Sequence, residues 1–256
     1  MKSSGHLKIK EISGLKYQGG QKRYVMRPYV VVNIAMSADG KISTRERRQV
    51  RISGAQDFKR VDSLKAGCDA IMVGIGTVIA DDPSLTVKSE ECLNYRRKKG
   101  WDDHPLRVVV DSSGATPPTA SFLCKGEGKR VVAVSGKADA KKIAVLGKKA
   151  TVLVAGSDEV DLGILMDELG KVGVRRLMVE GGGTLIAGLM KAGLVNEIYT
   201  FIGNIIIGGK DAPTVADGEG FIKESEFARL TLLEATRIDN GILLHWKVNN
   251  PEQIQE

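Results

Sequence analysis

Cysteine and aromatic residues are scarce in this sequence. Its three cysteines, Cys68, Cys92 and Cys124, are widely spaced along 256 residues. An odd number at such spacing fits neither a disulfide framework nor a zinc-ligand pattern, so we expect reduced thiols in a cytoplasmic protein. Phe, Trp and Tyr make up only 5% of the chain. None interrupts the one dense basic run, Arg96–Lys99, which we therefore interpret as a solvated loop and not as a nucleic-acid site.

Long hydrophobic runs are absent as well. No apolar stretch reaches the roughly 18 residues that a membrane-spanning helix needs, so no membrane partner is expected. Residues 1–26 lack the apolar segment of a signal peptide, and their charge and glycine content predicts a flexible N-terminal extension. Residues 27–250 contain no internal repeat, low-complexity block or change in composition, which predicts a single domain.

Histidine clusters are also missing. His6, His104 and His245 lie far apart, so neither a metal site nor a Ser/His/Asp triad is predicted. The rest of the composition is that of a globular protein, with 42% hydrophobic and 27% charged residues. A net charge of +7 favours anionic ligands, among them phosphorylated small molecules.

Runs of β-branched residues alternate with helical patterns along most of the chain. Because strands and helices alternate first and strands follow one another at the end, we predict an α/β fold with a mostly parallel sheet flanked by helices and antiparallel strands at one edge. Residues 89–103 are expected to form a polar loop. Strands are predicted at 29–35, 70–73, 106–111, 130–134, 150–154, 176–180, 197–202, 228–233 and 243–248, and helices at 53–66, 137–146, 161–172 and 184–192.

Two junctions between a strand and the following segment carry ligand-binding patterns. After the first, Thr77 and Asp81 offer groups that bond ribose hydroxyls or an amide, unless Asp81-Asp82-Pro83 only forms a turn. After the second, the glycines of Glu180–Thr184 let a phosphate approach the backbone at a helix N-terminus, although such glycines also serve tight packing. This segment is neither a GxGxxG nor a Walker A motif. Together the two junctions suggest a cofactor held between two strand ends.

Five segments in order resemble the pyrimidine reductases of riboflavin biosynthesis in their stand-alone archaeal form. The resemblance covers nearly all of residues 27–248, and it extends to the reductase half of the bacterial bifunctional deaminase-reductases. It implies a fold similar to that of dihydrofolate reductase. The segments are NIAMSADGKI at 33–42, GIGTVIADDPSLT at 74–86, PLRVVVDS at 105–112, VEGGGTL at 179–185, and IGG at 207–209 with APT at 212–214.

The resemblance implies an NADPH-dependent oxidoreductase, with NADH as the alternative cofactor. It would reduce the ribosyl chain of 2,5-diamino-6-ribosylamino-4(3H)-pyrimidinone 5′-phosphate to the ribityl chain, and it would be a homodimer. The late strands at 198–202 and 243–248 are candidates for the contact between subunits. A nearby carboxylic acid or a water would deliver the proton, and Asp39 and Glu180 are the candidate catalytic residues, although on pattern alone Asp39 is also a turn residue. The implied cofactor-binding residues are Thr77, Asp81, Ser112, Val160, Gly181, Gly182, Gly183 and Thr184, and the implied substrate-binding residues are Asn33, Lys65, Leu85 and Lys88.

Other functions compete with this one. The substrate is alternatively the deaminated pyrimidine, or the chain is a dihydrofolate reductase-like enzyme with Asp57 or Asp62 facing a pterin. A non-catalytic nucleotide- or RNA-binding protein is a further alternative, which the glycine-containing junctions disfavour. The sequence has no zinc-deaminase motif, so we expect no deaminase activity from it.

Overall fold

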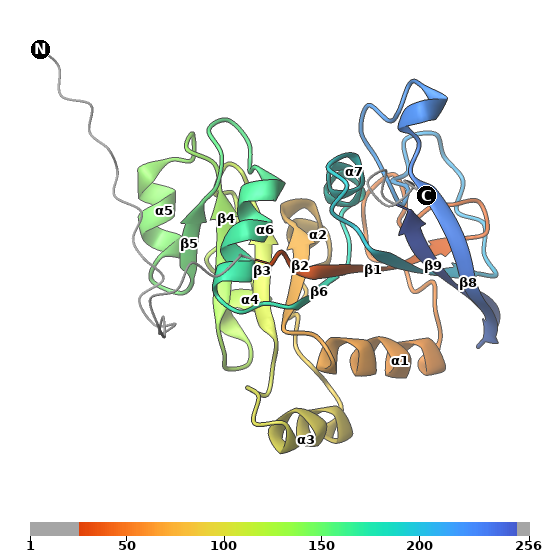
Figure 1. Cartoon of the computed structure of the whole chain (residues 1–256), viewed down its shortest axis with the longest axis horizontal. Coiled ribbons are helices and arrows are strands. Elements are labelled where there is room, and N and C mark those ends of the chain that lie inside the picture. Colours follow the sequence, from red (N-terminus) through yellow and green to blue (C-terminus); the bar gives the residue numbers. More distant parts are fainter. Residues whose placement is uncertain (1–25, 250–256) are drawn as a thin grey trace, which may run out of the picture.

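A single nine-stranded sheet organises the computed structural model, which describes residues 26–249 (Figure 1). The expected extension, apart from Met26, lies outside the described residues. The strand order is β5-β4-β3-β2-β6-β1-β7-β9-β8. The strands are β1 (Tyr29–Ser37), β2 (Ala70–Gly74), β3 (Leu106–Val110), β4 (Arg130–Val134), β5 (Thr151–Val154), β6 (Arg176–Val179), β7 (Glu197–Gly203), β8 (Arg229–Ile238) and β9 (Gly241–Asn249).

Seven neighbouring strands, from β5 to β7, run parallel, and the last two are antiparallel. β7 pairs with β9 and β9 with β8 in antiparallel register. The predicted fold class, with its antiparallel edge, is therefore confirmed. The helices are α1 (Ala55–Ala66), α2 (Ile75–Asp81), α3 (Glu90–Lys98), α4 (Ser121–Cys124), α5 (Ala140–Leu146), α6 (Leu162–Lys171) and α7 (Gly183–Lys191), with a 3-10 turn, η1 (Glu224–Glu226).

Two apolar clusters cover the two faces of the sheet. On one face, Val30 and Val32 of β1 pack with Leu165 of α6 and Leu189 of α7. On the other face, the apolar side chains of β2, β3 and β4 pack against those of α4 and α5. Alternate residues of β1 point away from α6 and α7 toward α1, since successive strand side chains face opposite sides. This leaves the carboxyl ends of the central parallel strands open for a site.

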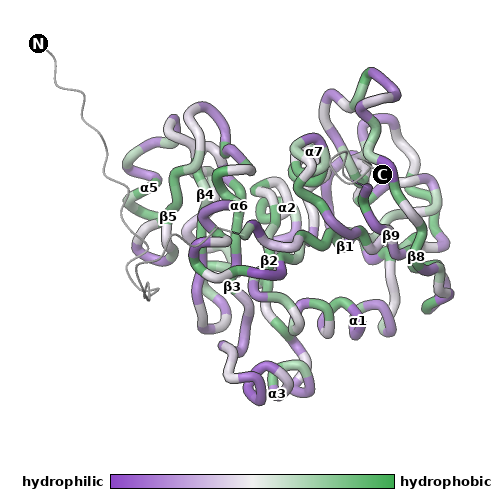
Figure 2. Tube along the Cα trace, in the orientation of Figure 1, coloured by the Kyte–Doolittle hydropathy of each residue, from purple (hydrophilic) through white to green (hydrophobic). Residues whose placement is uncertain are grey.

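Within residues 89–103, where a polar loop was expected, residues 90–98 form helix α3. Most of its residues are hydrophilic (Figure 2), so no apolar periodicity predicts a helix here. Its ends stabilise it instead. Ser89 Oγ accepts a hydrogen bond from the Cys92 N–H at 3.3 Å, acidic residues occupy the first turn, and Arg96, Arg97 and Lys98 occupy the last.

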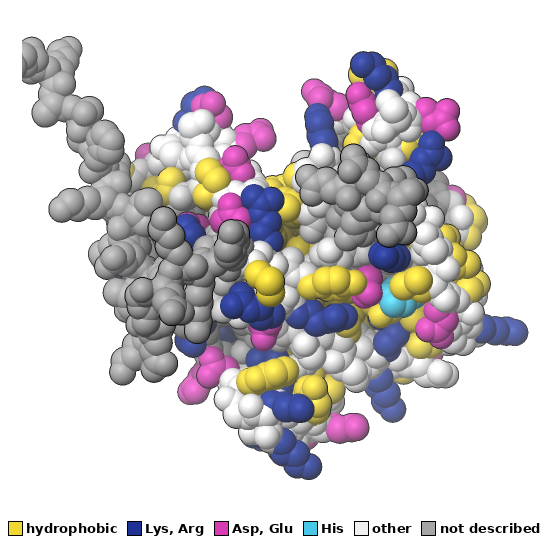
Figure 3. Space-filling view, viewed as in Figure 1, with side chains coloured by type: hydrophobic (Ala, Val, Ile, Leu, Met, Phe, Trp, Pro, Cys, Tyr) yellow, Lys and Arg dark blue, Asp and Glu magenta, His cyan; other side chains and the backbone are white. Residues whose placement is uncertain are grey.

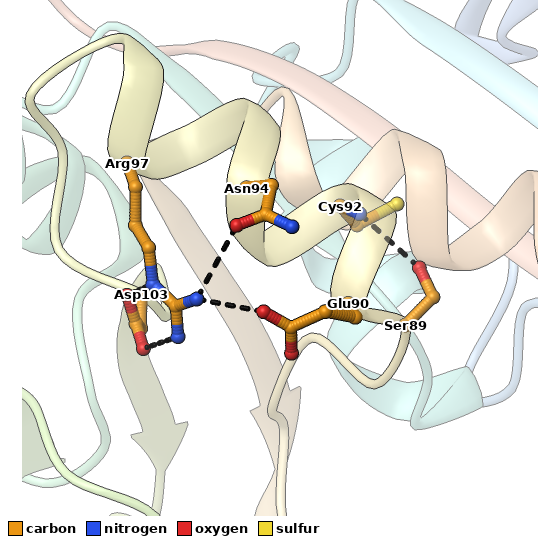
Figure 4. A network of polar contacts seen from close by, with 6 residues as sticks. All are labelled: Ser89, Glu90, Cys92, Asn94, Arg97 and Asp103. Atoms are coloured by element: carbon orange, nitrogen blue, oxygen red, sulfur yellow. Dashed lines mark hydrogen bonds and ion pairs between the residues drawn. The ribbon is translucent and has the colours of Figure 1, made fainter.

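The basic run at the end of α3 is only partly solvated. Arg97 binds Asp103 at 2.7 Å and Glu90 at 2.8 Å (Figure 4). Arg96 is only 4% exposed, and its Nη1 donates to the carbonyls of Ala66 and Cys68. The interpretation of this run as a solvated loop was therefore wrong for Arg96, which ties α3 to the segment between α1 and β2.

No helix within the described residues is long and apolar enough to span a membrane.

Candidate active site

A cleft of about 1190 Å³ lies at the carboxyl ends of the central parallel strands. Its walls come from β1, α1, the junction of β2 with α2, the end of β3, and the turn between β6 and α7. Most of the residues singled out in the sequence line it. These are Asn33, Lys65, Thr77, Asp81, Leu85, Ser112, Val160, Glu180, Gly181, Gly182, Gly183 and Thr184.

The glycines between β6 and α7 are needed by the backbone. Gly182, the residue before α7, has a φ of +96°, a conformation that side chains with a Cβ rarely adopt. A Cβ on Gly183 would lie 2.5 Å from the Thr214 carbonyl oxygen. Close packing therefore explains Gly183. The same turn nevertheless faces the cleft at the start of a nine-residue helix, so its amides are available to an anionic ligand.

The two aspartates after β2 have different roles. Asp81 ends helix α2 and lines the cleft, where burial raises the pKa of its carboxyl group. Among the described residues, its carboxyl group takes part in no hydrogen bond or ion pair. Asp82 has a φ of +42°, and its carboxylate accepts hydrogen bonds from Ser121 N and Oγ at 2.6 and 2.7 Å. Asp82 therefore closes the turn, whereas Asp81 is free to bind a ligand.

Ser112 and Val160 meet at the far end of the same wall. The Val160 N–H donates to Ser112 Oγ at 3.0 Å, which joins the end of β3 to the loop before α6. Both residues line the cleft beside Asp111. Asp111 itself is fully buried, and its carboxylate accepts hydrogen bonds from the backbone of Ala115 and Thr116.

An ion pair joins α1 to the turn that follows β6. Lys65 Nζ in the last turn of α1 lies 2.8 Å from Glu180 Oε1, just after β6, and the two side chains are only 16% and 14% exposed. Leu85 is buried nearby with a φ of +53°. Lys88 is not among the residues that line the cleft. Its Nζ donates to Ser84 Oγ at 2.7 Å, and burial together with the charges of Lys65 and Lys125 lowers its pKa.

Asn33 is anchored by a residue that sequence reasoning did not single out for the site. Its Oδ1 accepts a hydrogen bond of 2.6 Å from Arg60 Nη2. Arg60 comes from the middle of α1, where the adjacent basic residues Lys59 and Arg60 are typical either of a solvated helix face or of a contact with an anion. Only the fold, which lays α1 across β1 and β7, could reveal the contact.

Asp39 lies outside the lining of the cleft. Its carboxylate accepts hydrogen bonds from Ser37 Oγ at 2.6 Å and from the backbone N–H groups of Ile207 and Gly208 at 3.1 and 2.7 Å. These bonds, led by that from Ser37, lower its pKa to about 2. The structure thus places Asp39 as the anchor of the 207–208 loop.

The rest of the described chain offers no competing centre. Within residues 26–249, no group of three or more His, Cys, Asp or Glu side chains is placed to hold a metal ion. On the face seen in Figure 3, Lys and Arg side chains are interspersed with Asp and Glu, so no continuous basic stripe crosses that face.

Residues 28–244 match the family model of the RibD C-terminal domain. The chain belongs to this family. It is 53% identical over 205 residues to the 2,5-diamino-6-ribosylamino-4(3H)-pyrimidinone 5′-phosphate reductase of Archaeoglobus fulgidus, covering 80% of this chain and 93% of that one. Identity to the protein of the same name from Methanothermobacter thermautotrophicus is 43%, over 87% of this chain and 99% of the other.

Solved structures with this fold include members of the RibD family. Acinetobacter baumannii RibD, form 2, superimposes with a TM-score of 0.70 at 24% identity, covering 87% of this chain and 58% of that one. The Saccharomyces cerevisiae riboflavin biosynthesis reductase Rib7 superimposes with a TM-score of 0.62 at 20% identity, covering 90% and 94%. The resemblance to the pyrimidine reductases is therefore confirmed at the level of family and fold.

Proposed function

We propose that this RibD-family chain is an oxidoreductase of riboflavin biosynthesis. It reduces the ribosyl chain of 2,5-diamino-6-ribosylamino-4(3H)-pyrimidinone 5′-phosphate to the ribityl chain. The observation that carries the proposal is the similarity to two archaeal reductases of that name over nearly their whole length. One cleft also contains both the glycine turn and the Lys65–Glu180 pair, as a reaction between a cofactor and a substrate requires.

NADPH is the cofactor that we propose, with NADH as the alternative. When bound, it supplies the hydride for C1′ of the substrate. The amides at the start of α7, the Thr77 hydroxyl and the Asp81 carboxylate offer it hydrogen-bonding groups on one wall. Ser112 and Val160 extend this wall, so the cofactor would lie along the ends of β6, β2 and β3.

The Lys65–Glu180 pair is the proposed proton source. Lys65 Nζ is the donor of this contact and Glu180 Oε1 is the acceptor, 2.8 Å apart. We infer that Lys65 Nζ donates a proton to the substrate while Glu180 holds the amine in place. Asn33 and Leu85 would contact the rest of the substrate, with Lys88 at the rim of the cleft.

A homodimer is part of the proposal. β8 pairs only with β9 among the described residues, so it is an edge strand. Leu230, Leu232 and Leu233 on it are 41%, 49% and 50% exposed, and Figure 3 shows hydrophobic side chains along this side of the molecule. An unpaired edge with apolar side chains favours contact with a second copy.

A cytoplasmic location completes the proposal. Cys68, Cys92 and Cys124 are all free thiols, as expected of proteins in a reducing compartment.

The decisive measurement is the loss of NADPH absorbance with the diaminopyrimidinone ribosyl phosphate, run beside its deaminated analogue. We expect oxidation with the first substrate only. Oxidation with the analogue alone would mean that the chain is a reductase of the deaminated substrate. Oxidation with neither would refute the proposed reaction.

Glu180→Gln provides the variant for the same assay. We expect kcat to fall by roughly 10²-fold or more, because Lys65 loses the group that holds it. Glu168→Gln is the matched control, since Glu168 forms a similar pair with Lys171 on α6, away from the cleft, at 2.6 Å. Equal rates in the two variants would exclude a role of the Lys65–Glu180 pair in the reaction.

A further inference from the structure

Three neighbouring strands place polar and aromatic side chains in one row beneath α1. Asn33 of β1 is the register partner of Tyr199 of β7, which in turn is the partner of His245 of β9. Register partners share a face of the sheet. Tyr199 and His245 stack with ring centroids 4.0 Å apart. Asn33 is the member of this row that lines the cleft.

Arg60 lies above this row and is held from several sides. Its Nε donates to Asp57 Oδ1 at 2.8 Å, and the Asp57 side chain is only 3% exposed. Its guanidinium lies 5.4 Å from the centroid of the Tyr199 ring. A guanidinium group that is bound to a buried carboxylate and packs on an aromatic ring has little freedom to move. Arg60 does not itself line the cleft.

The contact between Arg60 and Asn33 fixes which end of the amide faces the cleft. A guanidinium group can only donate hydrogen bonds, so the atom that meets Arg60 Nη2 at 2.6 Å must be the Asn33 oxygen. The amide NH₂ then points away from Arg60. Within the described residues it has no hydrogen-bond partner of its own. Asn33 therefore presents a donor, and not an acceptor, to whatever occupies the cleft.

We propose that Arg60 is a positioning residue that holds the Asn33 NH₂ toward the substrate, where it donates to an acceptor atom of the pyrimidinone ring. A carbonyl oxygen or an unprotonated ring nitrogen is such an acceptor. This inference rests on the proposed function. We assign the ligand of Asn33 as the substrate and not the cofactor, because Asn33 belongs to the α1 side of the cleft, with Phe58, Val61 and Lys65. The glycine turn and Ser112 lie along β6, β2 and β3 instead.

Asn33→Asp tests the polarity of this wall. Aspartate has the same shape and still accepts from Arg60, but its second oxygen offers the substrate an acceptor in place of a donor. We expect the KM for the diaminopyrimidinone ribosyl phosphate to rise about 10- to 100-fold. The Kd for NADPH, measured by fluorescence without substrate, and the Tm should stay unchanged.

Arg60→Met tests the positioning role. We expect the substrate KM to rise about tenfold, because the freed amide samples both orientations, and the Tm to fall because Asp57 is left buried without its partner. Adding Asp57→Asn should recover the Tm but not the KM.

Arg176→Met is the matched control. Arg176 lies 5.6 Å from the Tyr29 ring centroid and near Glu197, away from the cleft, so the substrate KM and the NADPH Kd should stay normal.

Each result separates the inference from the reaction itself. An unchanged substrate KM in Asn33→Asp would overturn the inference, as would a weakened NADPH affinity in its place. Recovery of both Tm and KM in the Asp57→Asn, Arg60→Met variant would reduce Arg60 to a structural role. If the unaltered chain oxidised no NADPH with this substrate, the proposed function itself would be refuted, whatever the variants show.

Discussion

Asp39 illustrates how one residue can be important without touching the cleft. The sequence left it as either a turn residue or a proton donor, and its position in the structure, bound to the 207–208 backbone, supports a positioning role. Its pKa of about 2 lies below the roughly 4 of an unfolded aspartate. The ionised form therefore stabilises the fold above about pH 4, and this stabilisation is lost as the pH falls toward 2.

We predict that Asp39→Asn lowers the Tm near neutral pH and that the difference from the unaltered chain shrinks between about pH 4 and about pH 2. It should also reduce kcat more than NADPH affinity, because the loop moves but the glycine turn does not. Thermal unfolding at several pH values checks the first expectation, and steady-state kinetics the second. Asp139→Asn is the control: Asp139 accepts from two backbone N–H groups at the start of α5, so only its Tm should fall. A pH-independent difference would argue against the carboxylate's role.

At the scale of whole elements, the last hairpin carries the proposed contact between subunits. The sequence suggested that residues 198–202 and 243–248 form the contact between subunits. However, β7 and β9 each have a strand on both sides, and Ile198 and Phe201 are buried. β8 has the free edge. The position of β8 could not be deduced from the sequence. Alternating apolar residues show that a strand has one buried face, but they do not show which strand lies at the edge of the sheet.

We predict that Leu232→Glu converts the proposed dimer to a monomer, because it places a charge on the exposed apolar edge. Light scattering coupled to gel filtration measures the mass directly. Ile222→Glu is the control. Ile222 is 91% exposed in the segment before η1, so its substitution should leave the mass unchanged. A dimer that survives Leu232→Glu would place the contact elsewhere.

For the molecule as a whole, the sequence pattern predicted more of the fold than of the site. All nine strands could be found because buried parallel strands such as β2 and β3 are continuous apolar runs. Helices α2, α3 and α4 were missed, since α2 is short and rich in β-branched residues, α3 is hydrophilic and α4 has only four residues. The glycine turn could be found from composition. The partners of Asn33 and Lys65 could not, because they depend on the placement of α1 against strands far away in the sequence.

We predict a single cooperative unfolding transition that moves to higher temperature with NADPH. One continuous sheet joins both walls of the cleft, so neither wall should unfold alone. At a hundred times its Kd the cofactor should add about 2.7 kcal/mol to the free energy of unfolding. Calorimetry with NADPH and then NADH gives both the number of transitions and the preferred cofactor. Two separate transitions would contradict the single-domain expectation.

The strand order also has a consequence for biosynthesis. β1 pairs with β6 and β7 and never with β2, its successor in the chain. A nascent polypeptide therefore leaves the ribosome with its first strand unable to pair until residues 176–203 have been made, a delay on the order of ten seconds. During that time β2, β3, β4 and β5 can already assemble, whereas the valine-rich 30–32 segment stays exposed and is the natural place for a chaperone to bind.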